Sequence, residues 1–538
     1  MGIYIYLDIS KSVSHEQWSK VYKESLRLAE QLPFAELQRT EIQGINTLCI
    51  TPTKEHEALH RYSKNDTSRG WIASGNYIDM TLAEDHVLYE KLVDKNEVRP
   101  DAGDAIMNRL PSFIDCDPEA SEFNQVYNLW GSKTQGESYH IYLLGIACLI
   151  EARLGNKAFV YGDITRGQCR KAVKIINKYL EEPIDMPDSC YMERLADRIS
   201  ALPISEPEQI SVFVGLYKGT KKADFGEFLK NYYSENSLNA YWKTRFDETN
   251  LWTIGFDDCF RDYLLWGFNL ETLCTLIPFE KGETDCYEKF VRKIMESRLY
   301  IKNKNCKNVL EINPEDERTY GIYTLMMQIL FAGAGNEHID RYIPLEEIRA
   351  SLIRGIGNKC DINKIVDEYV TEEQLTSSGT KLQKMSEEIK NPSKHESLSE
   401  IFEKIVETEK EKLQKNDYTI QKFYDLLFYE TNDTVSPEIT ETLKFFIDSI
   451  QCFLQEDNYQ KLIQDSAFLR KTWLVEQNKY YLIRDKDWEK IFTDIEENEN
   501  AFARYYPIIR MQYPDSDLLN MGTALLLNDD VYEYAKNL

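Results

Sequence analysis

The chain contains 538 residues, of which 42% are apolar and 29% are charged. This length predicts about three domains, and the apolar fraction is enough for buried cores, which excludes a wholly disordered acidic protein. The 90 acidic and 64 basic residues give a net charge of −26. Such a charge disfavours direct binding to nucleic acid or to anionic membranes, because both are normally bound through clustered lysine and arginine. It suits a basic partner, or it serves only to keep a large protein soluble.

The cysteines and the N-terminal residues bear on the cellular compartment. Eleven cysteines are scattered along the chain without a C-x-x-C pair, which argues against a disulfide framework and against a cysteine zinc site. The first residues contain no basic segment followed by an apolar one, so we expect no signal peptide. No stretch approaches the roughly 18 consecutive apolar residues that a membrane-spanning helix needs. These features predict a cytoplasmic protein with no membrane segment.

Strand and helix patterns alternate in the first third of the chain. Short apolar runs predict strands at residues 3–7, 45–50 and 158–161, with a strand and a turn over 70–80. Apolar residues at helical spacing predict helices that follow the N-cap candidate Ser14 and that cover 138–153 and 165–180. This alternation indicates an α/β domain over residues 1–182.

Helical patterns dominate after Pro183. They cover residues 191–202, 208–217, 225–233, 256–276, 286–299, 320–332, 346–353, 362–369, 398–413, 418–429, 438–453 and 487–496. Residues 371–399 interrupt this series and are rich in Ser, Thr, Lys and Glu, as is typical of a linker. The prediction is an α+β fold, in which the N-terminal α/β domain precedes predominantly α-helical domains. These comprise a helical domain at 183–370, a polar linker at 371–399 and an acidic helical domain at 400–538.

One motif predicts catalysis. The segment His56-Glu57-Ala58-Leu59-His60 matches the H-E-x-x-H signature and resembles the zinc site of metallopeptidases. On a helix, two histidines four residues apart lie on one face and are able to bind one zinc ion. The resemblance implies that Glu57 is the general base for a metal-bound water and that Glu84 or His86 is a third ligand. The implied activity is that of a zinc-dependent peptidase or other hydrolase.

The residues around this motif favour a different interpretation. Residues 51–55 and 61–66 are mostly polar, whereas the active-site helix of a zinc peptidase is normally buried. A helix of about two solvated turns is marginal without packing. The competing interpretation is therefore an exposed polar helix or loop with incidental histidines. Zinc is expected only if the peptidase interpretation holds, and the sequence indicates no other cofactor.

A second motif follows the first predicted strand. Asp8, Ser10 and Ser12 form a D-x-S-x-S pattern that resembles the metal-ion-dependent adhesion motif of von Willebrand A domains. The resemblance implies an Mg²⁺ site at these three residues, with Asp163 in the place of that family's later aspartate. The alternative is that the hydroxyl groups cap the helix that begins near Ser14. Capping is the favoured interpretation.

The turn at residues 162–168 connects a predicted strand to a predicted helix. Thr165, Arg166 and Gly167 would offer backbone N–H groups and a guanidinium to a phosphate or a carboxylate. Asp163 opposes an anion at this place, and Asp and Thr are preferred at helix N-termini for capping alone. The favoured interpretation is again a helix cap.

The sequence contains no complete catalytic set besides the zinc motif. A nucleophile elbow, a dinucleotide fingerprint, a P-loop and the kinase motifs are all absent. Residues 361–538 contain 36 acids and 21 bases, a net charge of −15, so a basic partner would be sought there first. We therefore expect an acidic interaction protein that binds or neutralises another macromolecule, most simply a basic protein. The zinc hydrolase is the alternative.

Overall fold

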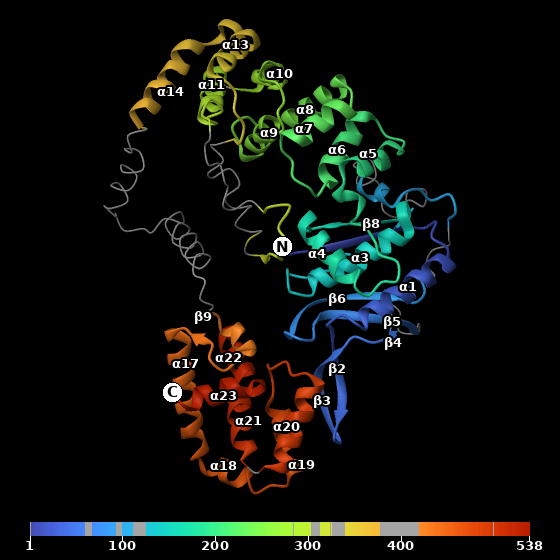
Figure 1. Ribbon diagram of the computed structural model, residues 1–538, viewed down its shortest axis with the longest axis vertical. Coiled ribbons are helices and arrows are strands. Elements are labelled where there is room, and N and C mark those ends of the chain that lie inside the picture. The colour runs from blue at the N-terminus through green and yellow to red at the C-terminus, as the bar shows by residue number, and fades with distance from the viewer. Residues whose placement is uncertain are drawn as a thin grey trace. The chain divides into compact units, whose positions relative to one another are not determined.

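The computed structural model describes residues 2–59, 67–92, 99–110, 125–282, 284–302, 312–322, 324, 339–376, 419–498 and 500–538. An α+β N-terminal region is followed by many helices, which confirms the predicted fold class (Figure 1). Contacts divide the chain into two compact units. Unit 1 consists of residues 1–25, 91–136 and 140–404, and unit 2 of residues 26–90, 137–139 and 405–538. The expected boundaries at 182 and 370 fall within unit 1, and the four-part division stays a prediction.

Unit 1 begins with a three-stranded antiparallel sheet in the order β7-β1-β8. Its strands are β1 (Ile5–Ser10), β7 (Val126–Trp130) and β8 (Ala158–Gly162). Strand β1 was predicted over residues 3–7, and it instead continues through Ser10 because β7 and β8 supply backbone partners on both sides. Successive side chains point to opposite faces, so Leu7 and Asp8 lie on different sides of the sheet.

Two helices pack together beside this sheet, α3 (His140–Leu154) and α4 (Arg166–Ile176). Helix α3 is apolar around almost its whole circumference and nearly all of it is buried, as expected for a helix inside a core. Gly145 allows α4 to approach closely, because a Cβ at this position would lie 2.6 Å from Cγ2 of Ile176. Helix α1 (His15–Ala29) begins after Ser14, whose hydroxyl oxygen accepts a hydrogen bond from the Gln17 N–H as predicted.

The other elements in the described part of unit 1 are helices (Figure 1). They include η1 (Ala105–Arg109), α5 (Met192–Ser200), α6 (Glu206–Leu216), α7 (Ala223–Tyr232), α8 (Glu235–Glu248), α9 (Ile254–Leu265), α10 (Leu270–Leu276), α11 (Cys286–Glu296), α13 (Leu345–Ile356) and α14 (Ile362–Thr376). The single helix predicted over 256–276 is wrong, because Gly267 adopts a φ of +83° and Asn269 caps a new helix, α10. Helix α14 extends into the first residues of the predicted linker. Residues 377–399 and most of the helix predicted at 320–332 lie outside the described residues.

Unit 2 contains a five-stranded sheet with β3, β2, β5 and β4 in this order and with β6 also paired to β5. The strands are β2 (Phe34–Ile42), β3 (Ile45–Pro52), β4 (His56–Leu59), β5 (Thr67–Asn76) and β6 (Thr81–Tyr89). Gln43 and Gly44 both have positive φ and join β2 to β3, as two-residue hairpin turns require. The apolar patterns predict β3 and part of β5, whereas β2 and β6 were not predicted.

The C-terminal helices of unit 2 pack against this hairpin. They are α17 (Pro437–Leu454), α18 (Asp457–Leu462), α19 (Ala467–Gln477), α20 (Asp485–Glu497), α21 (Ala501–Arg510), α22 (Ser516–Leu527) and α23 (Asp529–Lys536). Ile42, Ile45 and Cys49 of the hairpin are buried in one core with them, and Figure 1 shows β2 and β3 beside α20. The helix predicted over 418–429 is wrong: the chain forms β9 (Thr419–Ile420) and the 3₁₀ helix η6 (Phe423–Phe428). The helix predicted at 398–413 lies outside the described residues.

Candidate functional site

The H-E-x-x-H motif does not form the predicted helix. His56 to Leu59 form strand β4, which pairs with β5 so that His56 lies opposite Gly70. Strand β5 supplies hydrogen-bond partners for the backbone of this segment. A helix of two turns would be only marginally stable here without packing. Because neighbouring side chains of a strand point to opposite faces, Glu57 does not share the face of His56. The Nε2 atom of His56 lies 2.8 Å from a carboxylate oxygen of the buried Glu36.

The predicted third ligands lie on β6, away from His56. Gly70 of β5 lies between His56 of β4 and Tyr89 of β6, because it pairs with both. Glu84 lies five residues before Tyr89 on β6. Strand spacing therefore places the backbone of Glu84 roughly 15–20 Å from that of His56. His86 is buried against the ring of Tyr139. His60 lies outside the described residues, within which no cluster of three or more His, Cys, Asp or Glu side chains is arranged to hold a metal ion.

We expect EDTA to leave the melting temperature of the purified, untagged chain unchanged, because His56 is bonded to Glu36 and is separated from Glu84. Elemental analysis and a thermal melt with and without EDTA measure this. One zinc ion per chain that disappears in His56→Ala would contradict the expectation and would indicate a zinc site formed by His56 and His60.

The D-x-S-x-S pattern also differs from its predicted geometry. Asp8 lies inside β1 rather than in a loop after it, and it is fully buried. Its carboxylate accepts hydrogen bonds from the side-chain amides of Asn128, at 2.8 Å, and Asn108, at 3.4 Å. Burial raises the pKa of Asp8, and these amide hydrogen bonds oppose the rise. The Ser10 hydroxyl donates to the Gly103 carbonyl oxygen at 2.7 Å and is also bonded to the Ser12 hydroxyl.

Asp163 does not join these residues. Strands β1 and β8 are antiparallel, so the end of β8 lies beside the beginning of β1, where the Tyr4 N–H donates to the Asp163 carboxylate at 2.9 Å. Asp8 is four residues further along β1, which corresponds to roughly 13 Å. The von Willebrand arrangement requires both aspartates at the same edge of a sheet. The described residues therefore do not bring Asp8 and Asp163 into one cation site.

The beginning of α4 is a helix cap, and the backbone N–H groups of Arg166, Gly167 and Gln168 are already bonded within the chain. The Thr165 hydroxyl oxygen and the Gln168 side chain form a capping box, which confirms the favoured interpretation. The Gly167 N–H donates to the Pro314 carbonyl oxygen at 2.8 Å, and the Arg166 guanidinium pairs with the Glu315 carboxylate at 3.0 Å. Residues 313–318 of the same chain thus occupy the place where an external anion was predicted. No local pattern indicates this partner, which lies almost 150 positions away.

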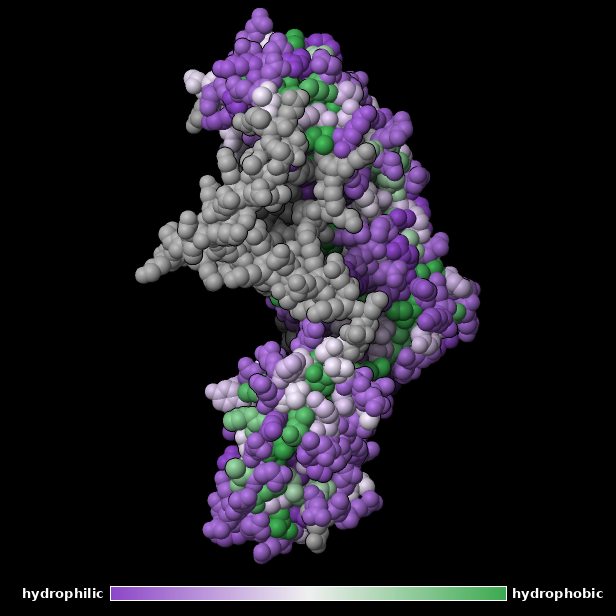
Figure 2. Space-filling model, turned by 60° about the vertical axis from the view of Figure 1, so that its left-hand side comes forward, coloured by the Kyte–Doolittle hydropathy of each residue, from purple (hydrophilic) through white to green (hydrophobic). Residues whose placement is uncertain are grey.

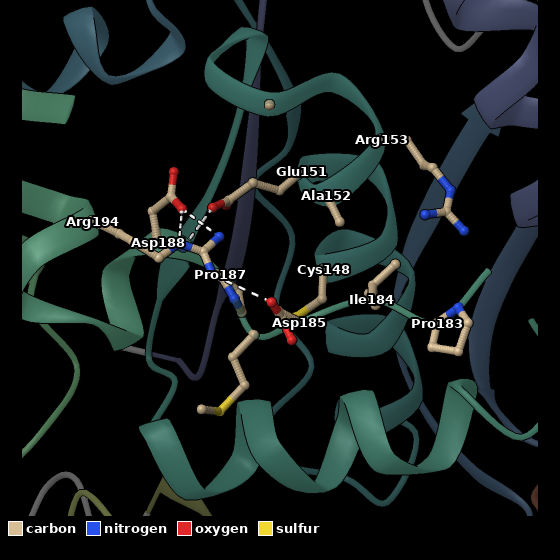
Figure 3. Close-up of a pocket in the computed structure, with 12 residues that line it drawn as sticks. Cys148, Glu151, Ala152, Arg153, Pro183, Ile184, Asp185, Pro187, Asp188 and Arg194 are labelled. Carbon is tan, nitrogen blue, oxygen red and sulfur yellow. Dashed lines mark hydrogen bonds and ion pairs between the residues drawn. The ribbon is translucent and has the colours of Figure 1, made fainter. Parts of the chain in front are cut away.

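A cavity of about 250 Å³ lies beside the C-terminal end of α3 (Figure 3). It is lined by residues of α3, of the following turn, of the segment 183–188 and of α5, namely Cys148, Glu151, Ala152, Arg153, Gly155, Pro183, Ile184, Asp185, Met186, Pro187, Asp188 and Arg194. Figure 3 shows the carboxylates of Glu151 and Asp188 close together, with Arg153 apart from them. Arg194 pairs with Asp188 at 2.7 Å, and Arg153 pairs with Glu24 at 2.9 Å. Each of the lining charges therefore has a partner within the chain.

A buried ionic network adjoins this cavity, centred on Arg198 of α5. The Arg198 guanidinium donates two hydrogen bonds of 2.8 Å to Asp104 and one of 3.0 Å to Asp188. A Glu151 carboxylate oxygen lies 3.8 Å from its Nη1. Three carboxylates thus surround one guanidinium whose side chain is only 6% exposed. The network ties α5 to α3, to η1 and to the segment before α5.

Glu151 is the group in this network with the most perturbed acidity. Burial raises its pKa to about 7, although Arg198 and the Val160 N–H lower it. Its two carboxylate oxygens accept hydrogen bonds from the backbone N–H groups of Val160, at 2.7 Å, and Asp188, at 3.0 Å. Both carboxylate oxygens of Glu151 are therefore occupied by hydrogen bonds to the backbone. Protonation of Glu151 near neutral pH would change this internal network. In the sequence, Glu151 stands out only as a charged residue within the apolar helix predicted at 138–153.

Charge is distributed unequally between the two units. Unit 2 contains 37 acids and 21 bases, a net charge of −16 on 202 residues, whereas unit 1 contains 53 acids and 43 bases, a net charge of −10 on 336 residues. Hydrophilic residues dominate the face of the described chain that Figure 2 shows. No helix within the described ranges is long and apolar enough to cross a membrane. No protein-family model, curated protein or solved structure matches the chain.

Proposed function

We propose that this chain binds a basic protein, and that the C-terminal helices of unit 2 make the contact. The observation that carries the proposal is the concentration of negative charge in unit 2. Residues 419–538 alone contain 22 acids and 12 bases. Complementary charge steers association and excludes partners of like charge, so an acidic surface favours a basic protein. Phosphate backbones and anionic lipid would be repelled by the same surface.

Among the described residues of 419–538, exposed acids outnumber exposed bases by fifteen to eight. Arg470 and Lys471 are buried, and Lys490 and Lys536 pair with acids on their own helices, Asp494 and Glu533. Exposed acids on or next to α17 and α18 are Glu438, Glu441, Asp448, Glu456 and Asp457. The exposed cations on these two helices are Lys444 and Lys461, so a basic partner would meet five exposed carboxylates against two exposed lysines there.

The test compares charge removal in the two units. One variant replaces the five exposed acids at 438, 441, 448, 456 and 457 with their amides. The matched variant replaces five exposed acids of unit 1, Glu227, Glu235, Glu248, Glu280 and Glu346. Each full-length protein is immobilised and challenged with the same cell lysate at low and high salt, and the bound proteins are identified by mass spectrometry.

We expect the unmodified chain to retain basic proteins at low salt, because exposed charges interact most strongly when they are weakly screened. The unit 2 variant should lose most of this binding, and the unit 1 variant should keep it. Equal loss in both variants, or a bound fraction that is not enriched in basic proteins, would overturn the proposal.

A further inference from the structure

Helix α19 exposes an apolar face to solvent. Phe468 is 54% exposed and Trp473 is 36% exposed, and Leu469 is exposed beside them. Leu469 and Trp473 are four residues apart, so they lie one above the other on the helix. Single exposed apolar side chains are ordinary on soluble proteins, whereas contiguous groups of them mark interaction sites.

The same helix turns its cations inward. Arg470 is 7% exposed and Lys471 is 2% exposed. The Lys471 ammonium donates to the side-chain carbonyl of Gln43 at 2.7 Å and pairs with Glu496, and the Arg470 guanidinium lies over the ring of Phe502. This is the reverse of the usual amphipathic helix, in which charged side chains face water. Phe468, Leu469 and Trp473 are therefore only partly buried within the described part of unit 2.

Two exposed tyrosines lie in loops that are joined near the end of α19. Tyr513 is 65% exposed, and Tyr480 is also exposed. The side chain of Gln512 holds the two loops together: its carbonyl oxygen accepts from the Tyr480 N–H at 2.7 Å, and its amide donates to the Gln477 carbonyl oxygen. Gln477 is one helical turn after Trp473. We name Phe468, Leu469, Trp473, Tyr480 and Tyr513 the aromatic stripe.

Exposed acids outnumber exposed bases next to the aromatic stripe by three to two. Within four residues of it, the exposed acids are Glu476, Asp515 and Asp517, and the exposed bases are Lys479 and Arg510. On the outward face of α19 itself, Glu476 is the only charged side chain. A partner that fits both features has an apolar face bordered by lysine or arginine.

We propose that the aromatic stripe is the docking surface for a basic amphipathic helix of the partner, an inference that rests on the proposed function. A helix presents apolar anchors at positions i, i+3, i+4 and i+7, which matches a line of apolar side chains along another helix. Tryptophan and tyrosine are the residues that most often dominate interface energies. Lysines beside the anchors would meet Glu476 and the wider acidic surface of unit 2.

Three synthetic peptides test this on the full-length chain. The first is a helical Lys/Leu peptide with one leucine face, the second is a Lys/Ser peptide of equal charge and length, and the third is a Glu/Leu peptide. Binding of each labelled peptide is followed by fluorescence anisotropy. The variant Leu469→Ser/Trp473→Ser is compared with Phe445→Ser, which removes a 74% exposed aromatic side chain from α17.

We expect the Lys/Leu peptide to bind more tightly than the Lys/Ser peptide. The double variant should weaken Lys/Leu binding by about tenfold or more, to the level of the Lys/Ser peptide, while Phe445→Ser leaves it unchanged. Undiminished Lys/Leu binding in the double variant, or equal weakening by Phe445→Ser, would overturn the docking surface but not the proposed function. Failure of both cationic peptides to bind, or equal binding of the Glu/Leu peptide, would overturn both.

Discussion

Replacing Arg198 with methionine is expected to destabilise unit 1 by about 3–5 kcal/mol at neutral pH. The substitution removes the one guanidinium that pairs with Asp104 and Asp188 and lies near Glu151. It also removes donors to the backbone carbonyl oxygens of Asn156 and Ala158. Methionine fills a similar volume, so the loss is dominated by buried carboxylates left without a cation rather than by a cavity.

Hydrogen exchange of the backbone amides in β8 and α5 measures this effect, because it reports local opening in a chain whose unfolding need not be two-state. The matched control is Arg194→Met. Arg194 is 46% exposed and pairs with the same Asp188, so its loss is expected to change stability by less than about 1 kcal/mol. Equal effects of the two substitutions would show that the buried network contributes no more than a surface ion pair.

The destabilisation caused by Arg198→Met should depend on pH. Without the guanidinium, the buried carboxylates near Glu151 become harder to ionise, so protonation relieves part of the penalty. The difference between the variant and the unmodified chain is therefore expected to be smaller near pH 5 than near pH 8. A difference that does not change with pH would mean that lost packing, rather than uncompensated charge, explains the effect.

Elements with a strong local pattern were predicted well from the sequence. Helix α3 is a continuous apolar run that fits only a buried helix, and β8 is a short apolar run between two helices. Ser14 and Thr165 have the residue types and spacing that cap helices, and both do so. In each case the decisive interaction joins residues within about one turn or one strand of each other, which is the range over which sequence patterns carry information.

Features that depend on distant partners were not predictable in this way. The segment around His56 has the residue types of a zinc-binding helix, and its pairing with β5 decides that it is a strand. The hairpin of β2 and β3 shares a core with helices that follow residue 436, some 400 positions later. Likewise Asp104, Glu151 and Arg198 meet only because three elements converge. The spacing of residues within a single segment does not predict which distant segments will pair.

Replacing Glu151 with glutamine is expected to flatten the pH dependence of the stability of unit 1. The folded chain holds Glu151 at a pKa of about 7, against 4.5 for an unperturbed glutamate. Between these values the folded state binds a proton that the unfolded state has released. Stability contributed by this group is therefore complete below about pH 4.5 and is lost as the pH rises to about 7. The loss over this window is about 3 kcal/mol.

The measurement is the free energy of local opening at β8, from hydrogen exchange corrected for the intrinsic effect of pH, at several pH values between about 4.5 and 8. Relative to Glu151→Gln, the unmodified chain should become progressively less stable as the pH rises. Arg198 and Asp188 face the same carboxylate, and their interactions with its charge are already contained in the Glu151 pKa, so they are removed together with that charge in Glu151→Gln. Glu182→Gln serves as the control, because that exposed residue bonds to Arg153 through its backbone carbonyl oxygen.

Parallel pH curves for the unmodified chain and Glu151→Gln would show that Glu151 keeps an ordinary acidity inside the core. The Arg198 guanidinium and the two backbone N–H groups would then outweigh the effect of burial.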